Sequence, residues 1–240
     1  MTASLLKRLE YDNFLVLATT KFIKIAPSLE ILTNILANGE LVESGGRGGA
    51  RFINANGHYW IVRDYLRGGL LGRINRNRYF FWTEERVRAF HEAQLLRHLY
   101  DLGLPVPKVV AALYQRVFLT YRCTIILERF KDVKPFGACA FELPENRWFK
   151  IGQLIRRLHD NKVNHVDLNC FNILIGEEKE FLIDFDKCHF VKKNLINEFF
   201  DWKQHNLKRL RRSLLKISNQ NDPLSKFEKL WQILLEGYQA

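Results

Sequence analysis

The sequence lacks the features of several protein classes. None of its apolar runs approaches the ~20 residues that a membrane-spanning helix needs, and the first residues contain no continuous apolar stretch of signal-peptide length. No repeat, low-complexity tract or Ser/Gly-rich linker interrupts the chain. We therefore expect a chain that is folded almost throughout and is kept in the cytosol or at a membrane face.

Cysteine is scarce and widely spaced. The sequence has 4 cysteines, which form no CxxC pair and no zinc-finger pattern: Cys123, Cys139, Cys170 and Cys188. We expect reduced, partly buried thiols.

Acidic residues are too few to balance the basic ones, and the formal net charge is +11. Such an excess attracts nucleic acid, an acidic membrane surface or a phosphorylated substrate. Between Arg63 and Arg88 the arginines are interleaved with Tyr79, Phe80, Phe81 and Trp82, and aromatic rings favour the headgroup interface. We prefer an anionic membrane surface to a solvated basic face. We expect no nucleic acid, because no recognition motif is present.

The first half of the chain is typical of β structure with one helix. The turn signal Asn56-Gly57 predicts a hairpin. Apolar residues at helical spacing predict a helix over 83–102, with Thr83 as its N-cap and Gly103 as its stop. The segment 117–130 is rich in β-branched and aromatic residues and is interpreted as two strands.

The second half is mainly helical. Its periodicity predicts a helix over 146–161, two short strands within 165–186 and basic helices over 194–238. The prediction is therefore an α+β fold with two lobes. The N-lobe, 1–129, would hold an antiparallel sheet with one main helix, and the C-lobe, 130–240, would be reduced and helical.

One segment carries chemistry. His165-x-Asp167-x4-Asn172 has the spacing of a kinase catalytic loop, and Asp184 follows an apolar strand where the metal-binding Asp of that fold belongs. Phosphoryl transfer needs a carboxylate for the acceptor hydroxyl, a role for Asp167, and oxygen ligands for Mg²⁺, a role for Asn172 and Asp184. A lone HxD would be an ordinary loop, but the Asn at the right offset and the two apolar strands favour the kinase-like fold.

The first half contains partners for ATP in the same fold. The loop 44–52 has enough glycines to cradle phosphate, and we assign that role to Gly46, Gly48 and Gly49, although the loop lacks the third Gly of GxGxxG and could be a plain hairpin turn. Glu92 lies on the predicted helix where the kinase glutamate belongs, with an exposed helix glutamate as the alternative. Glu128 ends the strand that leads into the hinge between the lobes.

No lysine occurs between Lys24 and Lys108, the region where kinases carry the strand lysine that pairs with phosphate. An arginine must substitute for it. We assign the role to Arg63, whose guanidinium can pair with both Glu92 and phosphate. Arg67 is the second candidate.

The acceptor is not expected to be a protein. There is no APE motif, too few residues follow Asp186 for a peptide-binding subdomain, and Asp186 replaces the Gly of DFG. Kinases that act on aminoglycosides or choline carry a similar loop. The sequence most closely resembles the 3-deoxy-D-manno-octulosonic acid (Kdo) kinases of Gram-negative bacteria, through Gly-Arg-Gly-Gly and three further segments: 63–70 (RDYLRGGL), 103–107 (GLPVP) and 165–169 (HVDLN) with Asp184-Phe185-Asp186.

This resemblance implies an activity. The family transfers phosphate from ATP, with Mg²⁺, to the 4-hydroxyl of a Kdo residue on a lipid A precursor, at the cytoplasmic face of the inner membrane as a peripheral protein. No obligate protein partner is expected. Two alternatives remain: another sugar kinase of the same fold, such as a lipopolysaccharide heptose kinase, and a non-catalytic binding module, which retention of Asp167, Asn172 and Asp184 disfavours.

Overall fold

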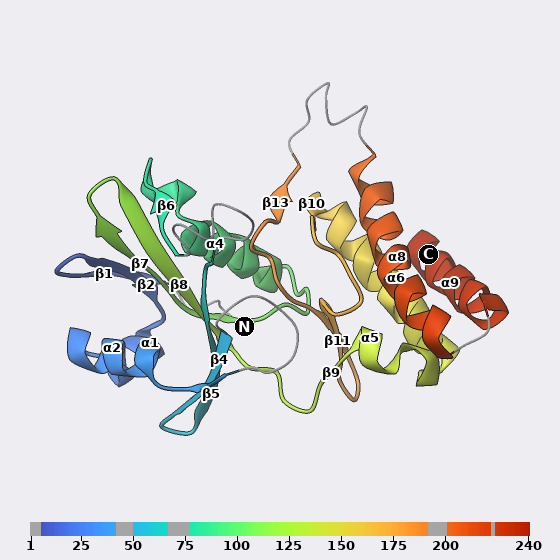
Figure 1. Ribbon diagram of the computed structural model, residues 1–240, viewed down its shortest axis with the longest axis horizontal. Helices are drawn as coiled ribbons and strands as arrows, with labels where there is room; N and C mark the ends of the chain where they lie inside the picture. The colour runs from blue at the N-terminus through green and yellow to red at the C-terminus, as the bar shows by residue number, and fades with distance from the viewer. Residues whose placement is uncertain (1–5, 42–49, 67–76, 192–200, 222–223) are drawn as a thin grey trace. The chain divides into compact units, whose positions relative to one another are not determined.

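A computed structural model describes residues 6–41, 50–66, 77–191, 201–221 and 224–240 (Figure 1). The chain divides into two compact units. Unit 1 consists of Met1–Asp101 and Pro107–Phe130, and unit 2 consists of Leu102–Val106 and Lys131–Ala240. The segment Leu102–Val106, which the sequence placed in the N-lobe, belongs to unit 2 because the Pro105 carbonyl accepts a hydrogen bond from the Leu182 amide at 3.0 Å.

Unit 1 is built on one antiparallel sheet. Its strand order is β1 (Lys7–Tyr11), β2 (Phe14–Ala18), β7 (Val109–Val117), β8 (Thr120–Glu128), β5 (His58–Asp64), β4 (Ala50–Ala55) and β3 (Glu40–Leu41), and β6 (Tyr79–Phe80) also pairs with β8. The expected hairpin is present, since Ala55 pairs with His58 across Asn56 and Gly57. Both turn residues have positive φ, 50° and 76°, as a tight two-residue turn requires.

Two parts of unit 1 differ from the sequence-based expectation. Residues 117–130 hold one complete strand, β8, and its partner is the preceding β7, which was missed because its continuous apolar run shows no alternation. Two short helices, α1 (Thr20–Ile25) and α2 (Leu29–Ala37), were also missed. Both begin at side-chain caps, in which Thr19 and Ser28 accept backbone N–H hydrogen bonds.

The main helix of unit 1 is shorter than expected. A single 3₁₀ turn, η1 (Glu84–Arg86), comes first, and α4 begins only at Arg88 and ends at Asp101. Val87 separates them because its backbone is extended, with ψ at 122°. The predicted stop is confirmed at Gly103, whose φ of 73° is in the left-handed region that favours glycine at a helix end.

The two faces of the sheet pack against different helices. Trp60 and Val62 of β5 join the cluster that contains Phe22 of α1 and Leu32 of α2. Side chains alternate along a strand, so Arg63 points to the opposite face, where it meets α4. The sequence of β5 therefore fixes which residue faces α4.

Unit 2 is mainly helical, as expected. Its helices are α5 (Phe136–Cys139), η2 (Ala140–Glu142), α6 (Glu145–Asp160), α8 (Trp202–Asn221) and α9 (Leu224–Gln239). Its strands form two small sheets, β12 (Glu180–Leu182), β11 (Ile173–Ile175) and β9 (Lys134–Pro135) in one, and β10 (Val163–Asn164) with β13 (His189–Phe190) in the other. The predicted helix over 146–161 and the two strands within 165–186 are thus present, whereas residues 194–200 lie outside the described part.

Helices α6 and α9 approach closely at two glycines. A Cβ on Gly152 would lie 2.0 Å from the Leu234 carbonyl oxygen, and one on Gly237 would lie 2.1 Å from the Phe149 carbonyl oxygen. Only glycine fits at either position. Helix α8 turns Leu207, Leu210 and Leu214 into the unit 2 interior. All four cysteines, which lie in the described part of the chain, are buried and form no disulfide.

Candidate active site

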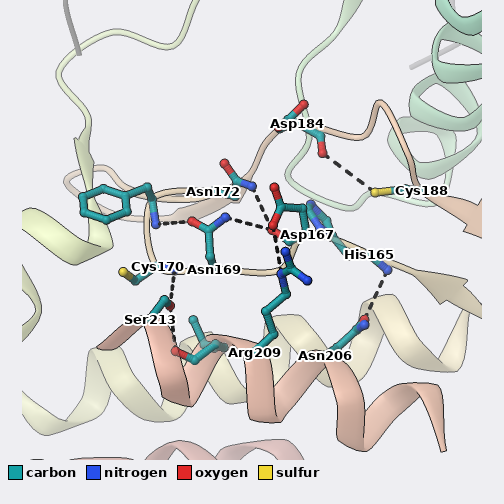
Figure 2. Close-up of polar contacts among 12 residues, drawn as sticks. His165, Asp167, Asn169, Cys170, Asn172, Asp184, Cys188, Asn206, Arg209 and Ser213 are labelled. Atoms are coloured by element: carbon teal, nitrogen blue, oxygen red, sulfur yellow. Dashed lines mark hydrogen bonds and ion pairs between the residues drawn. The ribbon is translucent and has the colours of Figure 1, made fainter. Parts of the chain in front are cut away.

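The loop that carries the kinase-like motif lies between β10 and β11 and is fixed by its own asparagines. The side-chain amides of Asn169 and Asn172 both donate to the Asp167 carbonyl oxygen, at 3.0 and 2.8 Å (Figure 2). The Asn169 amide oxygen in turn accepts from the Phe171 N–H at 2.9 Å. The two hydrogen bonds to the carbonyl at 167 hold the backbone of the loop at Asp167.

His165 joins this loop to the segment that contains Asp184. It is fully buried, its Nε2 lies 3.0 Å from the Ile183 carbonyl oxygen, and its ring packs edge-on against Phe185 with centroids 4.9 Å apart. Burial lowers the pKa of His165, with the Ile183 carbonyl opposing that shift. A neutral imidazole that donates to Ile183 suits this position. His165 is thus a positioning residue, which the motif contained but to which the sequence assigned no role.

The two predicted metal ligands lie on adjoining segments. The Ile183 N–H donates to the Asn172 carbonyl oxygen at 3.0 Å, which places Asp184 next to Asn172. The Asn172 side chain donates its NH₂ to Asp167, so its amide oxygen is left to ligate a cation. Asp184 has a φ of 64°, a conformation that only Gly, Asn and Asp visit routinely. Two hard oxygen donors fit Mg²⁺, which keeps several waters and takes its remaining ligands from phosphate. Among the described residues, no cluster of three or more His, Cys, Asp or Glu could hold a metal ion.

The Asp167 carboxylate has a partner that the sequence did not suggest. Arg209 of α8 donates from Nε to Asp167 Oδ1 at 2.9 Å, and both side chains are about two-fifths exposed, at 42% and 43%. In the sequence, Arg209 is one of several basic residues in the predicted C-terminal helices. Its contact partner lies far away in sequence, so no local pattern could have indicated this pair.

Two further residues of the same helix hold the loop that carries the kinase-like motif. Asn206 Oδ1 accepts from the His165 N–H at 3.2 Å, and Ser213 Oγ accepts from the Cys170 N–H at 3.0 Å. On the other side, the Gly137 N–H of α5 donates to the Cys170 carbonyl oxygen at 2.9 Å. Asn206, Arg209 and Ser213 are spaced three and four residues apart, which puts them on one face of the helix (Figure 2). We call this face the α8 polar seam.

In unit 1 the expected contact between Arg63 and Glu92 is present. Arg63 Nη2 lies 2.5 Å from both oxygens of Glu92, whose side chain is 1% exposed against 20% for Arg63. Tyr65 adds a contact that the sequence did not suggest, because its hydroxyl donates to Glu92 Oε2. Burial and, secondarily, the neighbouring Glu92 carboxylate raise the pKa of Tyr65 well above its usual value. Tyr65 therefore remains protonated and serves as a fixed donor.

The remaining predicted ATP contacts have mixed outcomes. Gly46, Gly48, Gly49 and Arg67 lie outside the described residues. Glu128 ends β8, where its N–H donates to the Lys108 carbonyl oxygen at 2.9 Å and its carboxylate lies 3.7 Å from Lys108 Nζ. Its N–H is thus taken, and a nucleotide would have to use the Glu128 carbonyl or carboxylate.

Comparison with known proteins agrees with this geometry. A sequence profile described as "Lipopolysaccharide kinase (Kdo/WaaP) family" matches residues 36–238. The chain is 43% identical over 205 residues to the 3-deoxy-D-manno-octulosonic acid kinase of Mannheimia succiniciproducens, covering 81% of this chain and 82% of that protein. It is 41% identical to the kinase of the same name from Haemophilus influenzae, covering 80% and 82%.

A solved structure confirms the predicted fold class. The structure titled "WaaP in complex with acyl carrier protein" superposes with a TM-score of 0.61 over 93% of this chain and 88% of that one, at 15% identity. At this identity the likeness concerns the fold alone.

Proposed function

Because the chain belongs to the lipopolysaccharide kinase (Kdo/WaaP) family, we propose that it transfers the γ-phosphate of ATP to the 4-hydroxyl of a Kdo residue on a lipid A precursor. The observation that carries this proposal is the loop from His165 to Asn172. Asn172 of this loop is hydrogen-bonded to the Asp167 carbonyl oxygen and accepts the Ile183 N–H, so Asp167, Asn172 and Asp184 belong to adjoining segments. The Kdo kinase relatives are similar over four-fifths of the length of the chain.

The residues divide into distinct tasks in this proposal. Asp167 accepts or orients the acceptor hydroxyl, and Asn172 and Asp184 hold Mg²⁺, which when bound neutralises charge on the phosphate oxygens. Arg63 binds phosphate oxygens, and Glu92 with Tyr65 holds its guanidinium in place. The glycines 46, 48 and 49 cradle phosphate, and Glu128 contacts the nucleotide.

The test is Mg²⁺-dependent ATP consumption by the purified chain. We expect ADP release that requires a Kdo-bearing lipid A precursor. Release with a heptose-containing acceptor lacking Kdo would favour a heptose kinase instead. A chain that consumes no ATP with any acceptor would favour a binding module.

For localisation, we propose peripheral attachment to an anionic membrane surface at the cytoplasmic face of the inner membrane. Within the described ranges, no helix has the length and apolarity to cross a bilayer. Support for surface attachment comes from the tip of the β7–β8 hairpin. Phe80, Trp82, Phe118 and Leu119 are 61%, 72%, 91% and 65% exposed, and the Phe81 N–H donates to the Leu119 carbonyl, which joins the two segments at this tip.

The turn itself departs from ordinary turn chemistry. Val117 pairs with Thr120, so Phe118 and Leu119 form a two-residue turn, and only Phe118 has positive φ. Glycine is the usual residue at the first position of such a turn. Phe118 has a φ of 54°, which costs about 1–2 kcal/mol for a residue with a bulky side chain. Exposed Arg116 and Arg122 flank the turn. An apolar tip with a cationic rim fits the headgroup region of an anionic bilayer.

Cosedimentation with vesicles that contain phosphatidylglycerol tests this attachment. Replacing Phe118-Leu119 by Gly-Asn should lower vesicle binding at least tenfold while keeping or raising the melting temperature, because glycine suits the positive φ at position 118. Leu224→Asn removes another exposed apolar side chain, 60% exposed at the start of α9, and serves as the control. Equal binding by the turn variant and wild type would refute the role of the tip.

A further inference from the structure

We propose that Arg209 forms an anion-binding subsite beside Asp167 and holds the carboxylate of the acceptor sugar while Asp167 engages the hydroxyl to be phosphorylated. This inference rests on the proposed function. It adds a residue for acceptor recognition on α8, a helix outside the kinase-like motif.

The first support is the way in which Arg209 meets Asp167. Only Nε is engaged, at 2.9 Å from Asp167 Oδ1, and the described residues offer no hydrogen-bond partner to Nη1 or Nη2. A guanidinium has five N–H donors, and the pair of Nη groups forms a fork that matches the two oxygens of a carboxylate. With 42% of the side chain exposed, this fork is accessible from solvent.

The second support is the rigidity of the surroundings. On either side of Arg209 along α8, Asn206 and Ser213 are hydrogen-bonded to the backbone of the catalytic loop. Asn206 is 1% exposed and also donates to Asn164 Oδ1 at 2.9 Å. The α8 polar seam therefore fixes the helix against the loop, and the Arg209 guanidinium is held beside Asp167. A preorganised charged donor binds more strongly than a mobile surface arginine.

The third support concerns which anion binds. Two groups in the reaction have suitable oxygens, the terminal phosphate of ATP and the acceptor carboxylate. Arg209 approaches Asp167 from α8, whereas Asn172 and Asp184 lie on the side of the loop away from that helix (Figure 2). Mg²⁺ and the phosphates belong with Asn172 and Asp184, so the Arg209 side is left to the acceptor. On a Kdo ring the carboxylate and the 4-hydroxyl are close enough to engage Arg209 and Asp167 together.

The experiment compares KM values for ATP and for the Kdo-bearing lipid A precursor, in detergent, for wild type, Arg209→Gln, Arg209→Lys and the control Arg212→Gln. Arg212 is an exposed arginine on the same helix. We expect Arg209→Gln to raise the acceptor KM by about 10- to 100-fold, the scale of a lost charge-assisted hydrogen bond, with the ATP KM within about twofold of wild type. Arg209→Lys should recover part of the loss, because it keeps the charge without the fork.

A second acceptor, whose Kdo carboxylate is converted to the amide, separates direct binding from indirect effects. For wild type, the acceptor KM should rise on the amide substrate by about as much as Arg209→Gln raises it on the carboxylate substrate. For Arg209→Gln, changing the carboxylate to the amide should raise the acceptor KM little further. If Arg209→Gln raises the KM for ATP and still prefers the carboxylate acceptor to the amide as strongly as wild type does, the Arg209 fork binds phosphate and the proposal is overturned. Equal sensitivity of wild type and Arg209→Gln to the amide would also overturn it, leaving Arg209 only as a partner of Asp167. If wild type does not phosphorylate the Kdo acceptor, the proposed function fails and this inference fails with it.

Discussion

Arg63→Met should reduce both the stability of the fold and the rate of phosphate transfer, and the structure allows us to separate these two effects. The Glu92 carboxylate is 1% exposed, and its partners include Arg63 and the Tyr65 hydroxyl. Removing the guanidinium takes a cationic partner from this buried carboxylate. Breaking a buried ion pair in this way costs about 3–5 kcal/mol. We therefore expect Arg63→Met to lose stability of that size in denaturant unfolding, in addition to any effect on phosphate transfer.

The double variant Arg63→Met/Glu92→Gln isolates the second effect. Glu92→Gln removes the buried charge but keeps an acceptor for Tyr65, so most of the lost stability should return. If Arg63 binds phosphate oxygens, the stable double variant should still be slower than wild type by roughly two to three orders of magnitude at saturating ATP, the scale of one preorganised donor at a transition state.

The assay is initial-rate ATP consumption with the Kdo acceptor, run beside urea unfolding of the same samples. A double variant that is stable and turns over at the wild-type rate would refute the phosphate role of Arg63 and reduce the ion pair to a structural contact. Loss of activity in Arg67→Met with a stable, active Arg63 double variant would move the role to Arg67.

Three further outcomes are expected. Asn172→Ala and Asp184→Ala should each raise the Mg²⁺ concentration needed for half-maximal activity or abolish activity, since each removes an oxygen ligand; unchanged metal dependence in both would place the metal elsewhere. Burial is the main cause that lowers the pKa of His159 to about 4. As pH drops from about 6.5, the pKa in the unfolded chain, towards 4, the unfolded chain binds the proton first, so the free energy of unfolding should fall by at most about 3 kcal/mol. His159→Gln should flatten this pH dependence in urea unfolding. Gly152→Ala should destabilise unit 2 by several kcal/mol in thermal unfolding, because its Cβ would lie 2.0 Å from the Leu234 carbonyl oxygen.

The parts of the fold that the sequence predicted are those with local signals. The Asn56-Gly57 turn, the helix stop at Gly103 and the helix over 146–161 each depend on residues within a few positions of one another. The missed strand β7 is buried on both faces, and such strands show no alternation. Helix α4 starts late because the extended backbone at Val87 interrupts a pattern whose apolar spacing continues through it.

The same distinction holds for the candidate site. Asp167, Asn172 and Asp184 could be proposed because their spacing along the chain reflects one loop and the strands beside it. Arg209 could not, because it reaches Asp167 from a helix that begins at Trp202, and only the packing of α8 on the loop brings the two together. The contribution of Tyr65 to Glu92 likewise depends on how α4 lies on the sheet.

The most direct test of the account is to identify the product. After incubation with ATP, Mg²⁺ and a Kdo-bearing lipid A precursor, mass spectrometry should show the mass of one added phosphate on the precursor, and phosphorus NMR should assign it to the 4-hydroxyl of Kdo. The Asp167→Asn variant should fold normally, because the Asp167 side chain is 43% exposed, and it should give no such product. A product with phosphate on another sugar, or the same product from Asp167→Asn at the wild-type rate, would contradict the assignment.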